Sequence, residues 1–324
     1  MKRWREWAVK VLLYGLLWTN AGALWAQDYP AKPVRYMVPS SAGSAVDTIG
    51  RIIAQGMSEA FGQQVVVENR AGAGGNIGAA MVAKAPADGY SLLQVNNNHT
   101  TNVNLYRELN YDLMRDFVPV TKLAVSPYAL VVHPSLPVKS IADLIKLAKS
   151  RPGVITYSSA GIGSGTFMAT ELFKSQAGLN MLHIPYAGGG PALTAVMSGE
   201  ALLYGAPLST ALPHIQSGRL RALGVTTEKR LALLPGLPPV AETVPGYEFS
   251  AWAAIVAPAK TPAEITAAVR NAAIKALNKP EIVKRLSDLG YIIAPDPPAE
   301  LAKFMKADID KMAKLIKENN LTAN

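Results

Sequence analysis

The chain has 324 residues, a length typical of about two domains, and its content of 49% hydrophobic and 17% charged residues excludes bulk disorder. It contains no cysteine, which excludes a disulfide framework, a thiol nucleophile, a lipid-anchoring cysteine and a cysteine-bound metal. The formal net charge is +9, but lysines and acidic residues are interleaved in the last predicted helix, which indicates a solvated face and not a nucleic-acid site.

The N-terminus has the pattern of a secretory signal peptide. A basic start with Lys2, Arg3 and Arg5 precedes an apolar stretch at residues 8–18, and small residues lead up to Ala26. The apolar stretch is well short of the roughly 20 residues that cross a bilayer, so a membrane anchor is the weaker interpretation. We therefore expect cleavage after Ala26 and a secreted mature protein.

Short apolar strands alternate with helices along the first part of the mature chain. The expected elements are, in order, a strand at residues 34–39, a helix at 47–61, a strand at 65–69, a helix at 77–85 and a strand at 91–97. This rhythm predicts parallel sheets with helices on both faces.

The same rhythm restarts after Pro137, where Ser140 is expected to cap the next helix. The expected elements are a helix at 141–150, a strand at 154–158, a helix at 166–177, a strand at 181–185, a helix from 192, a strand from 201, a helix at 209–216 and a strand at 220–226. The sequence therefore predicts two α/β units.

Beyond Pro258 three helices dominate, at 262–277, 280–289 and 298–319, each with a proline at or near its start. In the last of them, apolar residues recur at helical spacing, which indicates a face packed on a core: Leu301, Met305, Ile309, Met312 and Ile316. We assign these methionines to packing and not to a ligand site.

Two extended apolar segments, at 117–133 and 249–258, are candidates for strands that cross between the units. A chain that leaves one α/β unit and returns to it needs two such crossings, so the second unit is predicted to be an insertion and the final helices to complete the first. The predicted organisation is a signal peptide at 1–26, a discontinuous domain 1 at 27–126 plus 253–324, and a domain 2 at 127–252.

Ligands of open α/β sheets bind at the carboxyl ends of the strands, where helix N-termini point. Three strand–helix loops are rich in small and hydroxyl residues, whose N–H and O–H groups can hold an anion without a cationic side chain. Two loops at corresponding places could face each other across a cleft and bind the two ends of a dicarboxylate. For each loop alone, an ordinary turn is the alternative. The candidate ligand-binding residues are Ser40, Ser41, Ala42, Gly43 and Ser44 in the first loop, Ser159, Gly161, Ile162, Gly163, Ser164 and Thr166 in the second, Ala187 and Gly188 in the third, and Asn98 and Ser209 elsewhere.

The glycine-rich run at residues 72–78 imitates a dinucleotide-binding fingerprint, because it follows a strand and opens a helix. A dinucleotide site would need an acidic residue about 20 residues later, at the end of the next strand. That strand runs into Asn96, Asn97, Asn98 and His99, which are not acidic. A structural turn is therefore favoured, and no cofactor is expected.

The sequence offers little for an enzyme. His99, His133, His183 and His214 are far apart, none has metal-ligand spacing, and no metal site is expected. Of the four, His99 at its strand end could line a cleft, and packing or surface positions are favoured for the others. Neither a G-x-S-x-G elbow nor a G-x-x-x-x-G-K-[ST] loop occurs, so no catalytic residue is assigned. A pair of acidic residues assembled only by the fold would escape this search.

Several motifs occur together in one order along the chain. They read V-V-V-E-N-R-A-G-A-G-G-N-I-G at 65–78, A-K-A-P-A-D-G-Y at 83–90, H-I-P-Y at 183–186, A-L-P-H-I at 211–215 and L-R-A-L at 220–223. With them, nearly the whole mature chain from Tyr29 onward resembles the solute-binding proteins of tripartite tricarboxylate transporters, the Bug or TctC family.

The resemblance implies a periplasmic binding protein-like (Venus flytrap) fold, in which two α/β domains joined by two crossing strands close on a ligand. It also implies that the first and fourth strand–helix loops, here residues 40–46 and 159–166, hold the carboxylates of the ligand, partly through water. Family ligands are mostly carboxylates, among them citrate, amino acids, nicotinate and diacids. The implied partners are a small carboxylate and integral membrane transporter subunits, with no nucleic acid, and we expect a periplasmic monomer.

Two departures from the family pattern bear on the ligand. The first loop of the family usually reads P-F-P-P-G-G-x-x-D, whereas residues 39–47 read P-S-S-A-G-S-A-V-D, which suggests a more polar pocket. Many members carry Asp-Asn where this chain has Ala206 and Pro207, so a side chain able to hold an amino group is missing. An amino-acid ligand is therefore disfavoured.

The predicted function is capture of a small carboxylate, a di- or tricarboxylate or an aromatic acid, and its delivery to a tripartite tricarboxylate-type transporter without catalysis. One alternative is a secreted α/β hydrolase or isomerase, against which the missing elbow and the scattered histidines count. The other is a sensor subunit that presents its liganded form to a membrane receptor, which the sequence does not separate from transport.

Overall fold

The computed structural model describes residues 29–322, so the predicted signal peptide and its cleavage site lie outside the described residues. All helices and strands named below belong to the compact unit Lys32–Asn324. Within the described residues, no helix combines the length and the apolar character of a membrane span.

One half of the sheet begins with parallel strands. Strand β1 (Val34–Val38) lies between β2 (Val65–Asn69) and β3 (Ser91–Asn96) and pairs in parallel with both. Branched apolar residues suit a pleated surface that is covered on both faces, and every residue of β3 is buried.

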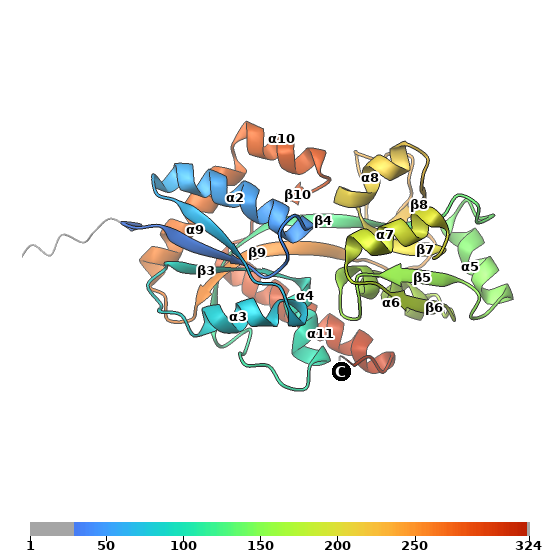
Figure 1. Cartoon of the computed structure of the whole chain (residues 1–324), viewed down its shortest axis with the longest axis horizontal. Coiled ribbons are helices and arrows are strands. Elements are labelled where there is room, and N and C mark those ends of the chain that lie inside the picture. The colour runs from blue at the N-terminus through green and yellow to red at the C-terminus, as the bar shows by residue number, and fades with distance from the viewer. Residues whose placement is uncertain (1–28, 323–324) are drawn as a thin grey trace, which may run out of the picture. The chain divides into compact units, whose positions relative to one another are not determined.

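Two long antiparallel strands connect this half with the other. Strand β4 (Phe117–Val132) pairs with β9 (Ser250–Pro258) as far as Pro127, and β9 also pairs with β3. From Tyr128 onward β4 pairs with strands of the second half instead. Figure 1 shows β4 and β9 running from one half of the unit to the other.

The second half repeats the parallel pattern. Strand β5 (Thr156–Ser159) pairs in parallel with β6 (Leu182–Pro185) and with β7 (Leu203–Pro207). Strands β7 and β8 (Arg221–Val225) both pair antiparallel with β4, as does the short β10 (Ile292–Ile293) in the first half. The main order of strands is therefore β2-β1-β3-β9-β4-β7-β5-β6.

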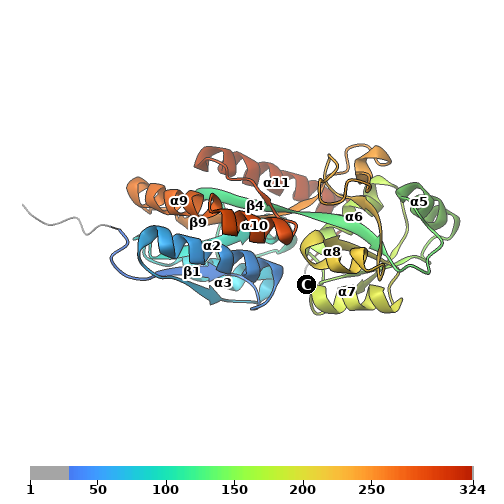
Figure 2. The same cartoon turned by 90° about the horizontal axis from the view of Figure 1, so that it is seen from above.

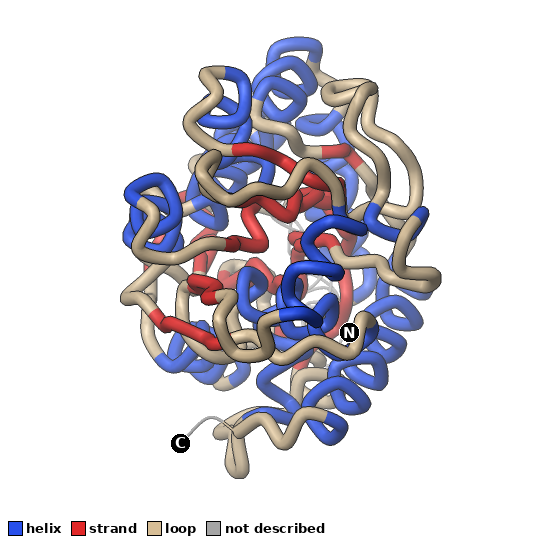
Figure 3. Tube along the Cα trace, turned by 90° about the vertical axis from the view of Figure 1, so that its right-hand side faces the viewer, coloured by secondary structure: helices blue, strands red, loops and turns tan. Residues whose placement is uncertain are grey.

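Helices cover the strands on both sides. Figure 2 shows α5 to α8 at one end of the sheet and α2, α3 and α9 at the other, and Figure 3 shows strands surrounded by helices. The bounds of the described α-helices are α2 (Ala45–Phe61), α3 (Asn76–Ala83), α4 (Asn97–Leu105), α5 (Ile141–Ser150), α6 (Gly165–Gln176), α7 (Gly189–Ser198), α8 (Leu208–Gln216), α9 (Ala263–Leu277), α10 (Pro280–Asp288) and α11 (Pro298–Glu318), with 3-10 turns at Ala73–Gly75 and Val240–Glu242.

Helix α11 packs against both halves of the sheet. Leu301 and Met305 join the apolar cluster of β3 and β9, whereas Met312, Leu315 and Ile316 join the cluster of β5 and α6. The apolar face predicted for this helix is confirmed, with Ile309 only partly buried. The domain limits predicted from the sequence, which gave all of α11 to domain 1, stay a prediction.

The predicted α/β fold with two crossing strands is confirmed, and most predicted elements match to within a few residues. Helix α4 and the two-residue strand β10 were not predicted. The run of asparagine and threonine in α4 does not indicate a helix. Helix α4 forms because Asn96 caps its start, accepting a hydrogen bond from the N–H of Asn98, while His99 accepts one from the N–H of Asn96. His99 thus lies buried in this cap and does not line the cavity described next.

Candidate functional site

A cavity of about 530 Å³ lies beside the crossing strands, where the ends of five other strands meet. Its lining includes the N-cap residue of five helices: Ser44 of α2, Asn96 of α4, Ser164 of α6, Gly188 of α7 and Pro207 of α8. The first N–H groups of a helix have no partner inside the helix, and its N-terminus carries a partial positive charge. The cavity is therefore an environment that favours anions.

The residues that the structure describes on the walls of this cavity are all uncharged, apart from tyrosines that can ionise only at high pH. None of the described residues that line it is Asp, Glu, Lys, Arg or His. A bound carboxylate would be held by N–H and O–H donors alone, and a bound ammonium group would meet no counter-charge.

Asp47, which is buried behind the first loop, fixes the shape of that loop. Its N–H donates to Ser44 Oγ at 3.2 Å, and its Oδ2 accepts from the N–H of Gly43 at 2.8 Å. Arg51 Nε donates to the same Oδ2 at 2.9 Å, and Asn69 Nδ2 donates to Oδ1 at 2.8 Å. Burial alone would raise the pKa of Asp47, but these hydrogen bonds hold it below its usual range. The carboxylate therefore stays ionised and the loop stays fixed at neutral pH.

The second loop is held by its own hydroxyl groups. Ser164 Oγ donates to the carbonyl oxygen of Gly161 at 2.6 Å and accepts from the N–H of Phe167 at 3.3 Å. Thr166 Oγ1 accepts from the N–H of Ala160 at 2.9 Å. These bonds fold the chain tightly in front of α6, so that the N-terminus of this helix opens onto the cavity.

Ser159 and His183 form a contact that the sequence did not suggest. Ser159 Oγ lies 2.7 Å from His183 Nε2 and accepts from the N–H of Gly161 at 3.0 Å. Burial lowers the pKa of His183, an effect that Glu171 partly opposes. Although the spacing matches that of a nucleophile and its base, Ser159 is fully buried and is absent from the cavity lining. We interpret the pair as a support of the second loop.

Aromatic side chains form part of the wall. Tyr291 donates to the carbonyl oxygen of Ala45 at 2.9 Å, and Trp252 Nε1 donates to Asp308 Oδ2 at 3.1 Å. Burial raises the pKa of Tyr291 to about 12 and those of Tyr128 and Tyr204 further above the usual range, so all three phenols are neutral.

The structure brings together most of the residues predicted from the sequence. Those that line the cavity are Ser41, Ala42, Gly43, Ser44, Asn98, Ser164, Thr166, Ala187 and Gly188. Whether they bind a ligand stays a prediction.

The other predicted residues lie outside the lining, each for a structural reason. Ser40 turns its Oγ to that of Ser44 at 2.7 Å, Ser159 is buried below the loop, and Ile162 is 52% exposed. Gly163 packs on Leu105, where a Cβ would lie 2.4 Å from Leu105 Cδ2. Gly161 supports the loop through its backbone, and Ser209 lies beside Gly290 with its hydroxyl buried.

Several lining residues were missed by the sequence reasoning. Asn97 could have been found, because it stands beside Asn98 at a predicted strand end. Tyr128, Trp252 and Tyr291 carry no local signal, since β4, β9 and the segment after α10 meet at the cavity only in the fold.

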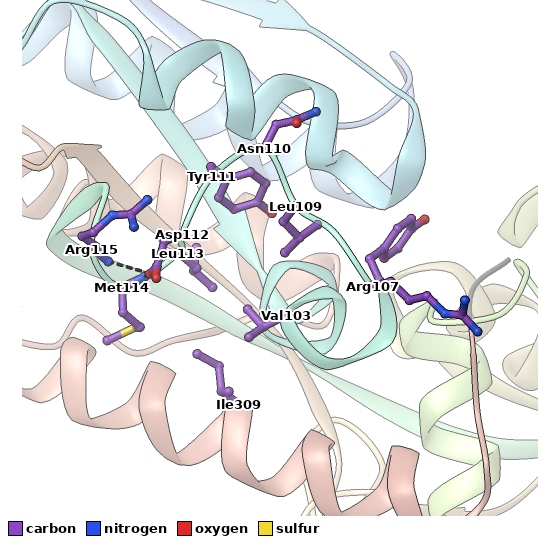
Figure 4. Close-up of a pocket in the computed structure, with 11 residues that line it drawn as sticks. Val103, Arg107, Leu109, Asn110, Tyr111, Asp112, Leu113, Met114, Arg115 and Ile309 are labelled. Carbon is purple, nitrogen blue, oxygen red and sulfur yellow. Dashed lines mark hydrogen bonds between the residues drawn. The ribbon is translucent and has the colours of Figure 1, made fainter.

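A second cavity, of about 590 Å³, lies on the surface between α11 and the segment that follows α4 (Figure 4). Among the described residues, its lining contains no helix N-cap. It includes Tyr106 at the end of α4, where the helix dipole is negative. Its Asp112 already accepts from the N–H groups of Met114 and Arg115. This cavity therefore lacks the converging donors of the first one.

No metal site accompanies either cavity in the part of the chain that the structure describes, where no three His, Cys, Asp or Glu residues are grouped for metal binding.

Known proteins resemble the chain along most of its length. The sequence profile described as "Tripartite tricarboxylate transporter family receptor" matches residues 49–321. A Pseudomonas sp. (strain P51) protein named "UPF0065 protein in tcbD-tcbE intergenic region" is 38% identical over 298 residues, which cover 91% of this chain and 89% of that protein.

Solved structures also resemble the chain, and they do so over a similar share of its length. The structure of R. palustris Rpa4515 with adipate is 36% identical with a TM-score of 0.84, covering 91% of this chain and 99% of that one. The periplasmic binding protein BugD is 30% identical with a TM-score of 0.82, covering 91% and 100%. MatC from Rhodopseudomonas palustris with bound malate is 28% identical with a TM-score of 0.79, covering 89% and 100%. The predicted periplasmic binding protein-like fold is thereby confirmed.

Proposed function

The chain belongs to the tripartite tricarboxylate transporter family of receptors, and from this membership we propose that it captures a small carboxylate in the periplasm and delivers it to the membrane subunits of such a transporter. The observation that carries the proposal is the convergence of five helix N-termini on a cavity whose described lining contains no Asp, Glu, Lys, Arg or His. Such a cavity attracts carboxylates through aligned backbone dipoles and disfavours cations.

The proposed ligand is a dicarboxylate without an amino group. N-caps on both sides of the crossing strands suit a molecule with an anionic group at each end, and related structures hold adipate and malate. Ala206 is buried in β7 and Pro207 lines the cavity, so neither provides an acceptor side chain for an ammonium group.

Delivery requires that the ligand be enclosed and later released. We propose that the two halves, residues 27–126 with 253–324 and residues 127–252, act as domains that close over the cavity about β4 and β9. We also propose that the protein acts as a monomer, because residues of one chain bring five helix N-caps together at the cavity.

The proposal contains no catalytic step. The family is one of receptors, and neither Ser159 nor His183 is among the residues that line the cavity. The proposed periplasmic location rests on the family, the relative BugD and the signal-like first 26 residues.

A thermal-shift screen of the ligand-stripped protein tests this function. The panel contains succinate, malate, adipate, citrate and benzoate, with the corresponding amides and aspartate as controls. A ligand present at about 100 times its Kd stabilises the fold by about 2.7 kcal/mol, which is an easily measured rise in Tm.

We expect a rise with at least one dicarboxylate and none with its diamide or with aspartate. Absence of a shift with every carboxylate, or turnover of the bound one, would contradict the proposal.

A further inference from the structure

Two polar side chains of the cavity lining, those of Asn97 and Tyr128, face the start of helix α6. A Cβ placed on Gly165, the first residue of α6, would lie 2.5 Å from the hydroxyl oxygen of Tyr128 and 3.0 Å from Asn97 Nδ2. The Cα–Cβ bond of a helical residue tilts toward the helix N-terminus, so both groups lie on the side where the first N–H groups of α6 open. They therefore border the place where an anion would meet this helix.

The first N–H groups of α6 are available to such an anion. The N–H of Phe167 already donates to Ser164 Oγ at 3.3 Å, whereas those of Gly165 and Thr166 make no hydrogen bond to a described residue. Both lie at the positive end of the helix dipole. Many helix starts offer as much without binding anything, and the two side chains beside this one distinguish it.

These two side chains are buried and unpaired, and they remain open to the cavity. Asn97 is 6% exposed and Tyr128 is 5% exposed, yet neither the amide nor the hydroxyl makes a hydrogen bond to a described residue. The unpaired atoms that are sealed from solvent include Ser126 Oγ and Ser209 Oγ but no atom of Asn97 or Tyr128. A group that enters the cavity can therefore reach both, and it would relieve the cost of leaving buried polar groups unpaired.

Both side chains are positioned by contacts that leave their polar ends free. The ring of Tyr128 packs edge-on against that of Phe249, with the centroids 5.3 Å apart. The backbone of Asn97 is fixed through its carbonyl oxygen, which accepts from the hydroxyls of Thr100 at 2.9 Å and Thr101 at 2.8 Å. Donors held in this way lose little conformational freedom when a ligand binds.

We propose that Asn97 and Tyr128 each donate a hydrogen bond to the ligand carboxylate that binds at the N-terminus of α6. The inference rests on the proposed function and assigns two specificity-determining residues to it. A carboxylate offers about four acceptor positions, which match the N–H groups of Gly165 and Thr166 together with one donor from each side chain. Because Asn97 belongs to α4, Tyr128 to β4 and Gly165 to α6, one carboxylate joins the first half, a crossing strand and the second half.

Titration calorimetry with succinate, malate and adipate tests the inference on the diacid that wild type binds most tightly. Tyr128→Phe removes one donor and should raise the Kd roughly tenfold to a hundredfold, as expected for a hydrogen bond to a charged group. Asn97→Asp keeps the shape of the side chain but places a second negative charge beside the carboxylate. It should raise the Kd by about a hundredfold or more.

Thermal unfolding of the ligand-free variants separates binding from folding. The hydroxyl of Tyr128 has no described partner, so Tyr128→Phe should unfold within about 2 °C of wild type. Asn97→Asp should also unfold near the wild-type temperature, because a negative charge at the first residue of α4 interacts favourably with the helix dipole.

Two variants outside the cavity lining are matched controls. Tyr106→Phe removes a tyrosine hydroxyl at the end of α4, and Asn271→Asp makes the same change of charge at an exposed position of α9. Both should bind the diacid with the wild-type Kd.

Wild-type affinity in Tyr128→Phe or in Asn97→Asp would overturn the inference and leave the proposed function standing. A loss of affinity that accompanies a large fall in Tm would overturn it as well, since the two residues would then act on the fold. If wild type binds none of the three diacids, the proposed function fails and the inference fails with it.

Discussion

Asp47 and Ser159, which are buried, and Asp308, which is partly buried, shape the candidate site without lining it. Asp47 ties the first loop to α2, and Ser159 ties the second loop to β5. Asp308 accepts from Trp252 Nε1 in the cavity wall at 3.1 Å and from Thr100 Oγ1 at 2.5 Å. Burial raises the pKa of Asp308, while these two hydrogen bonds oppose the rise. Such residues are recognised from contacts between distant segments and not from local sequence.

His99 makes the stability of the fold depend on pH. Burial lowers the pKa of His99 to about 4 from its usual 6.5, so below pH 6.5 the unfolded chain binds this proton more readily than the folded one. The contribution of His99 to the free energy of unfolding is therefore fully present above pH 6.5, and it is lost as the pH falls toward 4. We expect the free energy of unfolding to drop by about 2 kcal/mol between pH 7.5 and pH 5 from this group alone.

Urea unfolding of wild type and of His99→Gln at several pH values measures this contribution. The variant cannot take up the proton, so its pH dependence should be shallower than that of wild type by the stated amount, whatever its stability at pH 7.5. Parallel curves for the two proteins would show that His99 is not the responsible group.

At the scale of elements, the helix N-termini determine what the cavity attracts. Helix α6 packs closely on its neighbours at its start, because its first residue is Gly165. A Cβ on this residue would lie 2.5 Å from the hydroxyl oxygen of Tyr128 and 3.0 Å from Asn97 Nδ2. The absence of a side chain therefore lets α6 reach both β4 and α4, and through them both halves of the sheet.

Gly165→Ala should weaken ligand binding at least tenfold and reduce the free energy of unfolding by about 1–3 kcal/mol, because the added methyl group overpacks this contact. Calorimetry with the ligand found in the screen and urea unfolding give the two values.

Two further variants test the cause of this loss. Tyr128→Phe in the Gly165→Ala background removes the clashing oxygen and should recover part of the stability. Gly236→Ala, where a Cβ would meet nothing within 4 Å, should behave as wild type. Wild-type affinity in Gly165→Ala would mean that α6 does not need this close approach.

At the scale of the whole molecule, the charged side chains lie apart from the candidate binding cavity. The chain carries a net charge of +9, yet the described lining of the cavity bears no ionisable group except tyrosines that burial keeps neutral. The positive charge favours the approach of anions in general, while the dipoles and hydroxyls of the cavity hold the ligand.

Because no described lining residue titrates between about pH 6 and pH 9, we expect the affinity for the carboxylate ligand to hardly change in that range. Below about pH 5 the affinity should fall as the carboxylates of the ligand take up protons. Calorimetric Kd values across this range, in buffers of equal ionic strength, test the expectation. A Kd that changes about tenfold between pH 6 and pH 9 would reveal a titrating group in contact with the ligand.

The sequence by itself determined the α/β class, the two crossing strands and most helix bounds, because apolar periodicity, prolines and cap residues act over short distances. It also located the first and second loops, whose small and hydroxyl residues are adjacent in the chain. The tertiary structure alone decided that α4 is a helix, that Ser159 supports a loop instead of lining the cavity, and that Tyr128, Trp252 and Ser126 meet there. These features depend on contacts between segments far apart in the chain, and burial by such contacts overrides local preference.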